Sequence, residues 1–148
     1  GFCQQSQPKD DSRKLKLLDN FHKKMELLEE KANEFIVGAE IKVNSDGISA
    51  TFKNRDDHQV VMPVEMLSSG EQQIISILGF IIFFAGSFKD RLCLIDEPEI
   101  SMHPAWQELL GNVIYDFKEQ YGLNFIIATH SPMFIGERWD HVIELSHL

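Results

Sequence analysis

Two adjacent carboxylates, Asp96 and Glu97, directly follow the apolar run of residues 92–95. Such a run is typical of a buried strand, so the two acids would lie where the backbone leaves the core. Asp96 could hold Mg²⁺ through water, and Glu97 could orient and deprotonate a water that attacks a γ-phosphate. Solvated turn acids are the alternative when this pair is taken alone.

A second apolar run, residues 125–128, ends in Thr129, His130 and Ser131. Parallel strands deliver their carboxyl ends to one edge of a sheet, so we expect His130 at the same edge as the two acids. An imidazole there can donate a hydrogen bond to a γ-phosphate oxygen. A satisfied loop histidine is the alternative.

Ser68, Ser69, Gly70 and Glu71 precede a strongly apolar run. Ser68 followed three residues later by Glu71 is a capping box, which indicates a helix start. The N–H groups of a helix start, the two hydroxyls and the close approach allowed by Gly70 would also make an anion site. A helix start and a phosphate site are compatible.

The remaining sequence predicts the elements that must hold these residues. Residues 1–12 are polar and predict a disordered lead-in. From Ser12 a helix is expected, with apolar residues at alternating spacings of three and four, typical of a coiled-coil seam. The seam consists of Leu18, Phe21, Met25, Leu28, Ala32 and Phe35. Three heptads are equally compatible with one strand of a coiled-coil arm and with an amphipathic helix docked on its own domain.

An antiparallel hairpin is expected next. Residues 39–43 and 48–52 alternate between apolar and polar, and they flank the turn sequence of residues 44–47. A third short strand is predicted at residues 60–62, and Pro63 marks its end.

The pattern then alternates between helices and strands. Residues 70–84 predict a helix that is apolar nearly all round and therefore covered on most sides. Pro104 predicts the first turn of the next helix, and Gly122 predicts its end. The two apolar runs predict strands buried between two layers, with a third strand at residues 142–145. This order requires an α/β fold in which helices flank a parallel sheet.

The charge of the chain argues against direct nucleic-acid binding. Among the 148 residues, 14 are basic and 23 are acidic, which gives a net charge of −9. Residues 61–148 hold 4 basic and 12 acidic residues and would repel a phosphate backbone. A local basic patch remains an alternative to a solvated helix face, formed by Arg13, Lys14, Lys16, Lys23 and Lys24.

Other features favour a cytoplasmic chain with no membrane partner. The longest apolar stretch, residues 74–86, is shorter than the about 20 residues that span a bilayer. Cys3 and Cys93 cannot form a disulfide framework, which favours a reducing compartment. The sequence lacks an initiating Met, so we expect an excised piece of a longer protein.

Three motifs together resemble those of ABC-type ATPases. Residues 67–72 are similar to the family's signature motif, residues 92–97 to its Walker B strand, and residues 129–131 to its switch histidine. Their order and spacing agree with that family over about residues 60–135. The amino-acid sequences of the signature motif and of residues 96–104 resemble those of the SMC, RecF and OLD-like ATPases of DNA repair and anti-phage defence.

The resemblance implies a P-loop NTPase that uses ATP and Mg²⁺ and works as a dimer. Asp96 would bind the metal, while Glu97 and His130 would be catalytic in the same subunit. Ser101 and His103 would belong to the D-loop. The signature residues that would contact ATP held by the partner subunit are Ser68, Ser69, Gly70 and Glu71.

One motif of the family is missing. No Gly-x-x-x-x-Gly-Lys-Ser/Thr pattern occurs, so the chain lacks the Walker A loop and lysine that hold the β-phosphate. In SMC-type heads that loop lies on an N-terminal lobe, separated by a helical insertion from a C-terminal lobe. The resemblance therefore implies that residues 1–37 are a lead-in and returning heptad helix, and residues 38–148 the C-terminal lobe. By itself the chain is expected to be inactive. Its expected partners are the Walker A lobe and a second copy of the chain. The complete protein could act on nucleic acid or on an effector protein.

Two alternative functions stay open. The chain could be the nucleotide-binding subunit of an ABC transporter, although the heptad helix and residues 99–104 argue against this. It could also be a non-catalytic assembly module that retains the motifs. Mg²⁺-dependent ATP hydrolysis after addition of the missing lobe would distinguish an enzyme from such a module.

Overall fold

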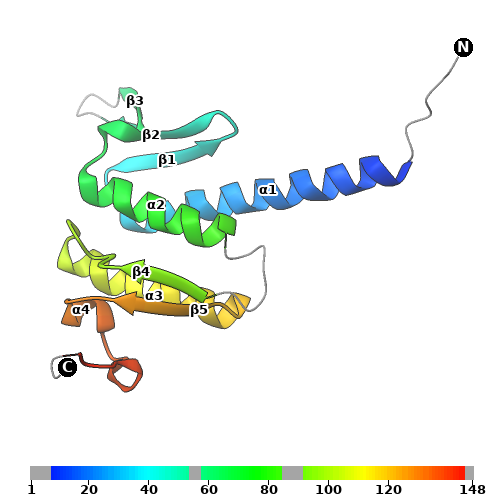
Figure 1. Ribbon diagram of the computed structural model, residues 1–148. Helices are drawn as coiled ribbons and strands as arrows, with labels where there is room; N and C mark the ends of the chain where they lie inside the picture. The colour runs from blue at the N-terminus through cyan, green and yellow to red at the C-terminus, as the bar shows by residue number, and fades with distance from the viewer. Residues whose placement is uncertain (1–7, 54–57, 85–91, 146–148) are drawn as a thin grey trace, which may run out of the picture.

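The computed structural model describes residues 8–53, 58–84 and 92–145. Figure 1 shows the first sheet on one side of the helices α1 and α2, and a layer of two strands and a helix on the other. The two sheets have the strand orders β1-β2-β3 and β4-β5. In chain order the elements are α1 (Pro8–Phe35), β1 (Ala39–Asn44), β2 (Gly47–Lys53), β3 (Gln59–Pro63), η1 (Val64–Met66), α2 (Ser69–Phe84), β4 (Leu92–Asp96), α3 (Pro104–Tyr121), β5 (Asn124–Ala128), α4 (Pro132–Ile135) and η3 (Trp139–His141).

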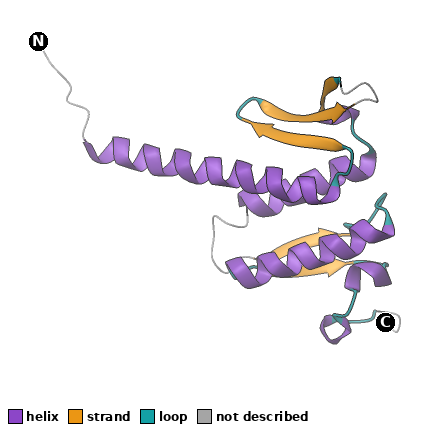
Figure 2. Cartoon of the chain, turned by 180° about the vertical axis from the view of Figure 1, so that it is seen from behind, coloured by secondary structure: helices purple, strands orange, loops and turns teal. Residues whose placement is uncertain are grey.

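Helix α1 begins at Pro8, so the predicted disordered lead-in is wrong from residue 8 onward; the rest of it lies outside the described residues. Proline is favoured in a first helical turn because its missing N–H has no helical partner there. Only the C-terminal half of α1 is docked: Met25 and Leu28 are buried, whereas Leu18 is 63% exposed. The N-terminal half projects beyond the body (Figures 1 and 2). A docked amphipathic helix therefore describes the second half of α1.

The predicted hairpin is confirmed. Strands β1 and β2 pair antiparallel with Asn44 opposite Gly47, which leaves a two-residue turn between them. Ile41 and Ala50 lie opposite each other and are both fully buried. Strand β3 pairs with β2 and ends at Pro63, as predicted. The alternating pattern thus gives this sheet one apolar face, which packs on the helices.

Helix α1 also covers the outer edge of β1 with polar side chains. The amide of Asn33 accepts a hydrogen bond from the backbone N–H of Ile41 (2.8 Å) and donates one to the same residue's carbonyl (3.0 Å). The N–H of Val43 donates to a carboxylate oxygen of Glu29 at 3.0 Å. Backbone groups on a sheet edge need such partners, so these bonds fix the sheet to the helix.

The predicted parallel arrangement of β4 and β5 is confirmed, with Asp96 opposite Ala128 at the carboxyl ends. Helix α3 connects the two strands and lies along their sheet (Figure 2). It starts at Pro104, and Gly122 ends it in a left-handed conformation (φ 64°). The α/β fold class follows from this parallel sheet and its flanking helices.

The expectation that both strands are buried between two layers is wrong for the described part of the chain. Cys93 faces the core and is 8% exposed, but its neighbours Leu92 and Leu94 are 55% and 69% exposed. Ile126 of β5 is 60% exposed. Alternate residues of a strand point to opposite faces, so one apolar face of this sheet is uncovered in the part that the structure describes.

The predicted strand at residues 142–145 is also wrong. The chain forms the short 3-10 helix η3 at Trp139–His141 and has no regular structure over residues 142–145. Ile143 is 86% exposed. An apolar alternation forms a strand only where a neighbouring strand can pair with it, and the described residues place none there.

Helix α2 holds the core together. Ile74, Leu78 and Ile81 are at most 1% exposed and join the residues of α1, β1, β2 and α3 in one cluster. Phe80 remains 45% exposed, so the expected cover is incomplete on one side. None of the helices in residues 8–53, 58–84 and 92–145 is both long enough and apolar enough to cross a bilayer.

Candidate functional site

The end of β4 delivers two carboxylates to the predicted edge. Asp96 is the last residue of the strand and is exposed. The N–H of Glu97 donates to the carbonyl of Ala128 at 2.8 Å, which extends the parallel pairing by one residue. Glu97 has a φ of 44°, a left-handed conformation that is uncommon for residues with a long side chain. The backbone therefore turns sharply at Glu97 while it is still anchored to β5.

The structure brings Glu97 and His130 together. Nε2 of His130 lies 3.2 Å from Oε1 of Glu97. The His130 side chain is 91% exposed and that of Glu97 38% exposed, so both can reach a ligand outside the chain. Two groups 33 positions apart in sequence thus form a pair at one rim of the sheet, the place that the sequence predicts for them.

Sequence reasoning missed Glu99, a third acid at this rim. Glu99 is only 9% exposed, and its Oε1 accepts hydrogen bonds from the hydroxyl of Thr129 (2.5 Å) and the N–H of His130 (3.0 Å). Its other oxygen, Oε2, is buried without a hydrogen-bond partner in the described part of the chain. The Asp-Glu-Pro-Glu sequence contains this acid, but nothing in its spacing indicates that it faces inward.

The helix start predicted at Ser68 is confirmed as a capping box. The N–H and hydroxyl of Ser68 donate to a carboxylate oxygen of Glu71 at 2.8 and 2.6 Å, and the N–H of Glu71 approaches the Ser68 hydroxyl at 3.4 Å. Ser68 and Ser69 are exposed. The amino end of α2 is therefore well formed and open to an approaching group, as an anion site requires.

Gly70 has a role that the sequence did not predict. It is buried, and a Cβ at this position would lie 2.6 Å from the carbonyl oxygen of Ser101 and 3.5 Å from the Trp106 ring. Ser101 itself adopts a left-handed φ of 64°. The absence of a side chain at Gly70 thus lets the turn after β4 pack directly on the start of α2.

Side-chain amides tie the same elements together. Gln73 of α2 donates to the carbonyl of Pro98 at 3.1 Å. Gln107 of α3 donates to the carbonyl of Met102 at 3.0 Å and accepts from the hydroxyl of Ser131 at 2.5 Å. The amino end of α2, the turn after β4 and the loop after β5 therefore form one connected unit at the same end of the molecule (Figure 1).

His103, placed in the D-loop by resemblance, caps α3. Its Nδ1 accepts a hydrogen bond from the N–H of Ala105 at 3.3 Å. This bond satisfies one of the free N–H groups of the first turn. A role of His103 toward nucleotide remains a prediction.

The carboxylate of Asp96 fits a magnesium site whose remaining ligands come from other molecules. Asp96 offers one exposed carboxylate at the strand end, and Mg²⁺ is usually held by one or two carboxylates together with water and phosphate oxygens. In the described ranges, no group of three or more His, Cys, Asp and Glu side chains could hold a metal ion. The other ligands would have to come from the nucleotide and from outside this chain.

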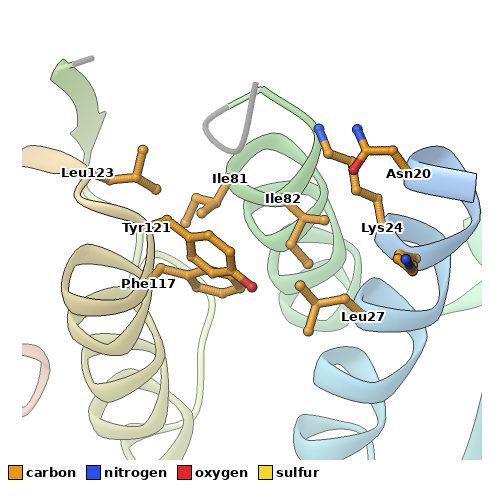
Figure 3. A pocket seen from close by; sticks show the side chains of 9 residues that line it. Asn20, Lys24, Leu27, Ile81, Ile82, Phe117, Tyr121 and Leu123 are labelled. Carbon is orange, nitrogen blue, oxygen red and sulfur yellow. The ribbon is translucent and has the colours of Figure 1, made fainter. Parts of the chain in front are cut away.

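A pocket between α1, α2 and α3 lies away from this rim (Figure 3). It is near the carboxyl ends of α2 and α3, whereas the motifs are at their amino ends. Its volume of about 160 Å³ is below the roughly 300 Å³ at which small-molecule sites begin. The pocket is lined by Asn20, Lys23, Lys24, Leu27, Ile81, Ile82, Phe117, Tyr121 and Leu123. The pocket is therefore too small for a nucleotide and lies apart from the residues at the rim.

Comparison with protein families identifies the chain. The family model described as "AAA domain, putative AbiEii toxin, Type IV TA system" matches residues 4–136, which is most of the sequence. The chain belongs to this AAA-domain family. Membership makes it a nucleotide-binding ATPase module, in line with the predicted class. No curated protein matches the AAA domain.

Solved structures confirm the fold. The AAA domain matches one SMC structure, described by "ATP-driven dimerization and DNA stimulated activation of SMC ATPases", with a TM-score of 0.59, 16% identity and coverage of 80% of this chain and 74% of that one. It matches the "SmcHead bound to the C-winged helix domain of ScpA" with a TM-score of 0.64, 16% identity and coverage of 84% and 39%. A Smc head with a coiled coil from Pyrococcus yayanosii gives a TM-score of 0.61, 17% identity and coverage of 85% and 25%.

The AAA domain thus has the fold of SMC ATPase heads, which is the fold class predicted from its motifs. It spans well under half the length of the second and third of these chains.

Proposed function

We propose that this AAA domain supplies the hydrolytic acids and the histidine of an ATPase whose triphosphate-binding loop lies on a separate lobe. The observation that carries the proposal is the 3.2 Å contact between Nε2 of His130 and Oε1 of Glu97 at an open rim. A carboxylate and an imidazole in contact at the carboxyl end of a parallel sheet suit a phosphoryl-transfer site.

In the proposed reaction, Glu97 orients a water and takes its proton as the water oxygen attacks the γ-phosphorus. The bond between the γ-phosphorus and the bridging oxygen breaks, and ADP leaves with that oxygen. When ATP is bound, the N–H at Nε2 of His130 turns from Glu97 and donates a hydrogen bond to a γ-phosphate oxygen, where negative charge increases in the transition state. The left-handed turn at Glu97 supports this step because the backbone of this residue is held against β5.

Asp96 is the proposed contact for Mg²⁺, because this ion is held by one or two carboxylates together with phosphate oxygens and water. When bound, the ion would neutralise charge on the phosphate oxygens. The backbone of Asp96 pairs in register with Ala128, so this residue lies at the strand end directly before Glu97.

The uncovered face of the β4–β5 sheet supports a separate Walker A lobe. Leu92, Leu94 and Ile126 together present an exposed apolar surface, and such surfaces mark interaction sites. The AAA domain covers only 39% and 25% of two SMC head chains that share its fold. A lobe that packs a further layer on this face would bury the surface and could hold the triphosphate at the rim.

The exposed start of α2 supports action in trans. Ser68 and Ser69 are exposed beside the open amino end of the helix, which favours an anion. In the proposed dimer the Ser69 hydroxyl and the backbone at Gly70 contact the γ-phosphate of ATP bound to the partner subunit. Ser68 and Glu71 would join this contact by exchanging their capping-box bonds for bonds to the phosphate. One structural relative is described by ATP-driven dimerization, which is consistent with this arrangement.

For the biological setting, anti-phage defence is favoured over DNA repair. The description of the matched family names a putative toxin and a toxin–antitoxin system. We infer that the ATP-dependent dimer controls an effector or a nucleic-acid target, which the acidic surface of this domain does not bind by itself.

The test replaces Glu97 by Gln in the complete protein that carries the Walker A lobe. We expect turnover to fall by at least about 100-fold because the general base is lost. ATP-stabilised dimers should persist because the amide keeps the shape of the site. The measurements are steady-state phosphate release and size-exclusion chromatography with ATP and Mg²⁺.

The matched control is Glu137→Gln, which changes an exposed acid outside the rim. This control should hydrolyse ATP at the rate of the unmodified protein. Unchanged hydrolysis by the Glu97→Gln protein would reject Glu97 as the base. No hydrolysis by the unmodified complete protein would favour a non-catalytic assembly module.

A further inference from the structure

Glu99 links the two loops that carry Glu97 and His130. It lies in the turn after β4, and its Oε1 accepts two hydrogen bonds from the loop after β5. The donors are the hydroxyl of Thr129 and the backbone N–H of His130. One carboxyl oxygen therefore holds residues that are 30 and 31 positions away in the sequence.

The burial of the Glu99 carboxyl group lowers the stability of the fold. Burying a carboxyl group is unfavourable unless hydrogen bonds replace its water, and Glu99 is only 9% exposed. Two bonds satisfy Oε1, but Oε2 has no hydrogen-bond partner among the described residues. A smaller neutral side chain at this position would avoid the penalty, so packing alone does not explain an acid here.

The loop that Glu99 holds is braced at its next residue as well. The N–H of Ser131 donates to the Thr129 hydroxyl oxygen at 3.0 Å, so that hydroxyl both donates to Glu99 and accepts from the loop. The ring of His130, by contrast, is 91% exposed, and in the described part of the chain its polar contact is Glu97. The place of this ring thus depends on where the backbone of His130 is held.

We propose that Glu99 is a positioning residue for ATP hydrolysis: its buried Oε1 fixes the backbone of His130 so that the imidazole stays beside Glu97 and the γ-phosphate. This inference rests on the proposed function. Glu99 acts through hydrogen-bond acceptance and does not itself contact the substrate. A displaced imidazole would lower the rate of the chemical step without changing how tightly ATP binds.

The experiment compares Glu99→Leu and Glu99→Gln in the complete protein, with kcat and KM for ATP measured for each. Leucine removes both acceptor bonds, and we expect kcat to fall by about tenfold or more with KM within about twofold, as for a loss of orientation. Glutamine keeps an amide oxygen that can accept both bonds, so it should retain kcat within about threefold. Glu108→Leu and Glu108→Gln, at an exposed acid of α3, are the matched controls and should leave both constants unchanged.

A double-mutant cycle separates positioning from a general structural effect. In a His130→Ala background, Glu99→Leu should cause little further loss of kcat because the group it positions is already absent. An equal fold-loss in both backgrounds would overturn the proposal, as would full kcat in Glu99→Leu alone. Hydrogen exchange of the peptide covering residues 129–136 should also rise in Glu99→Leu and stay unchanged in Glu108→Leu.

Thermal unfolding and circular dichroism show whether Glu99→Leu folds. If it does not, Thr129→Val carries the test, because it removes one donor to Glu99 and keeps the shape of the side chain. We then expect a several-fold loss of kcat that disappears in the His130→Ala background; unchanged kcat would overturn the proposal. ATP hydrolysis that depends on Glu97 but not on Glu99 rejects this inference alone, whereas a complete protein that does not hydrolyse ATP rejects the proposed function and this inference together.

Discussion

At the scale of single residues, residues with unusual backbone conformations lie at the carboxyl-end rim of the β4–β5 sheet. Glu97 and Ser101 are the non-glycine residues with positive φ in the described part of the chain. Both lie in the turn that follows β4, and the carbonyl of Ser101 occupies the space beside Gly70. Left-handed residues of this kind persist where the surroundings hold them, and they concentrate at functional sites. The turn is therefore shaped by its contacts with α2 and β5.

Gly70→Ala tests this packing. The added Cβ would meet the Ser101 carbonyl at 2.6 Å, and a backbone atom must move to make room. We expect the free energy of unfolding to fall by about 1–3 kcal/mol, as measured by urea denaturation.

The control for this change lies in the same helix. A Cβ at Gly79 would meet Leu28 at 3.9 Å, an ordinary contact. Gly79→Ala should therefore stabilise the protein by about 0.5–1 kcal/mol through helix propensity. Equal effects of the two substitutions would contradict the close approach of the turn to Gly70.

At the scale of elements, α1 shows how one sequence pattern can serve two environments. Its heptad stripe is continuous, yet Leu28 is 3% exposed and Leu18 is 63% exposed. The docked half is fixed by apolar packing and by the bonds from Asn33 and Glu29 to β1. Among the described residues, the projecting half makes no such bonds to the sheet, and its Leu15, Leu17 and Leu18 are exposed.

Leucine-to-alanine substitutions at these two heptad positions should differ strongly. Leu28→Ala leaves a cavity in the core and should lower the free energy of unfolding by about 2–5 kcal/mol. Leu18→Ala removes an exposed side chain and should change it by less than about 0.5 kcal/mol. Chemical denaturation of the two variants provides the comparison, and a large effect at Leu18 would mean that the projecting half is packed in solution.

At the scale of the whole molecule, the described residues form a core on one side of the β4–β5 sheet and leave its other face uncovered. The core cluster joins α1, the β1–β3 sheet, α2 and α3. The opposite face of the second sheet exposes Leu92, Leu94 and Ile126. A parallel sheet is normally covered on both faces, so the architecture is consistent with half of a larger ATPase head.

Leu94→Lys tests that interpretation because its effect should depend on the rest of the protein. In this chain alone Leu94 is 69% exposed, so the free energy of unfolding should change by less than about 1 kcal/mol. In the complete protein the same lysine would be buried against the Walker A lobe, and we expect a loss of about 2 kcal/mol or more. Denaturation of both forms is the measurement.

Val37→Lys is the matched control, because Val37 is 91% exposed and lies between α1 and β1, outside the β4–β5 sheet. It should leave both forms unchanged. A Leu94→Lys protein that is equally stable with and without the Walker A lobe would show that the lobe does not cover this face.

The sequence by itself determined the features that depend on near neighbours. The capping box of Ser68 and Glu71, the hairpin turn closed by Gly47 and the helix limits at Pro104 and Gly122 follow from local backbone chemistry. The parallel order of β4 and β5 followed from the alternation of strands and helices, and the three motifs indicated the ATPase class.

Only the tertiary structure decided how distant segments meet. Glu99 turns inward onto Thr129, and Gly70 contacts Ser101, through packing between residues about 30 positions apart. The face around Leu94 is open because none of the described residues covers it. No short-range spacing encodes such contacts, because burial depends on what the rest of the molecule places opposite a side chain. The burial of Glu99 and the exposure of Leu94 therefore have the same cause: each depends on what the fold places opposite the side chain.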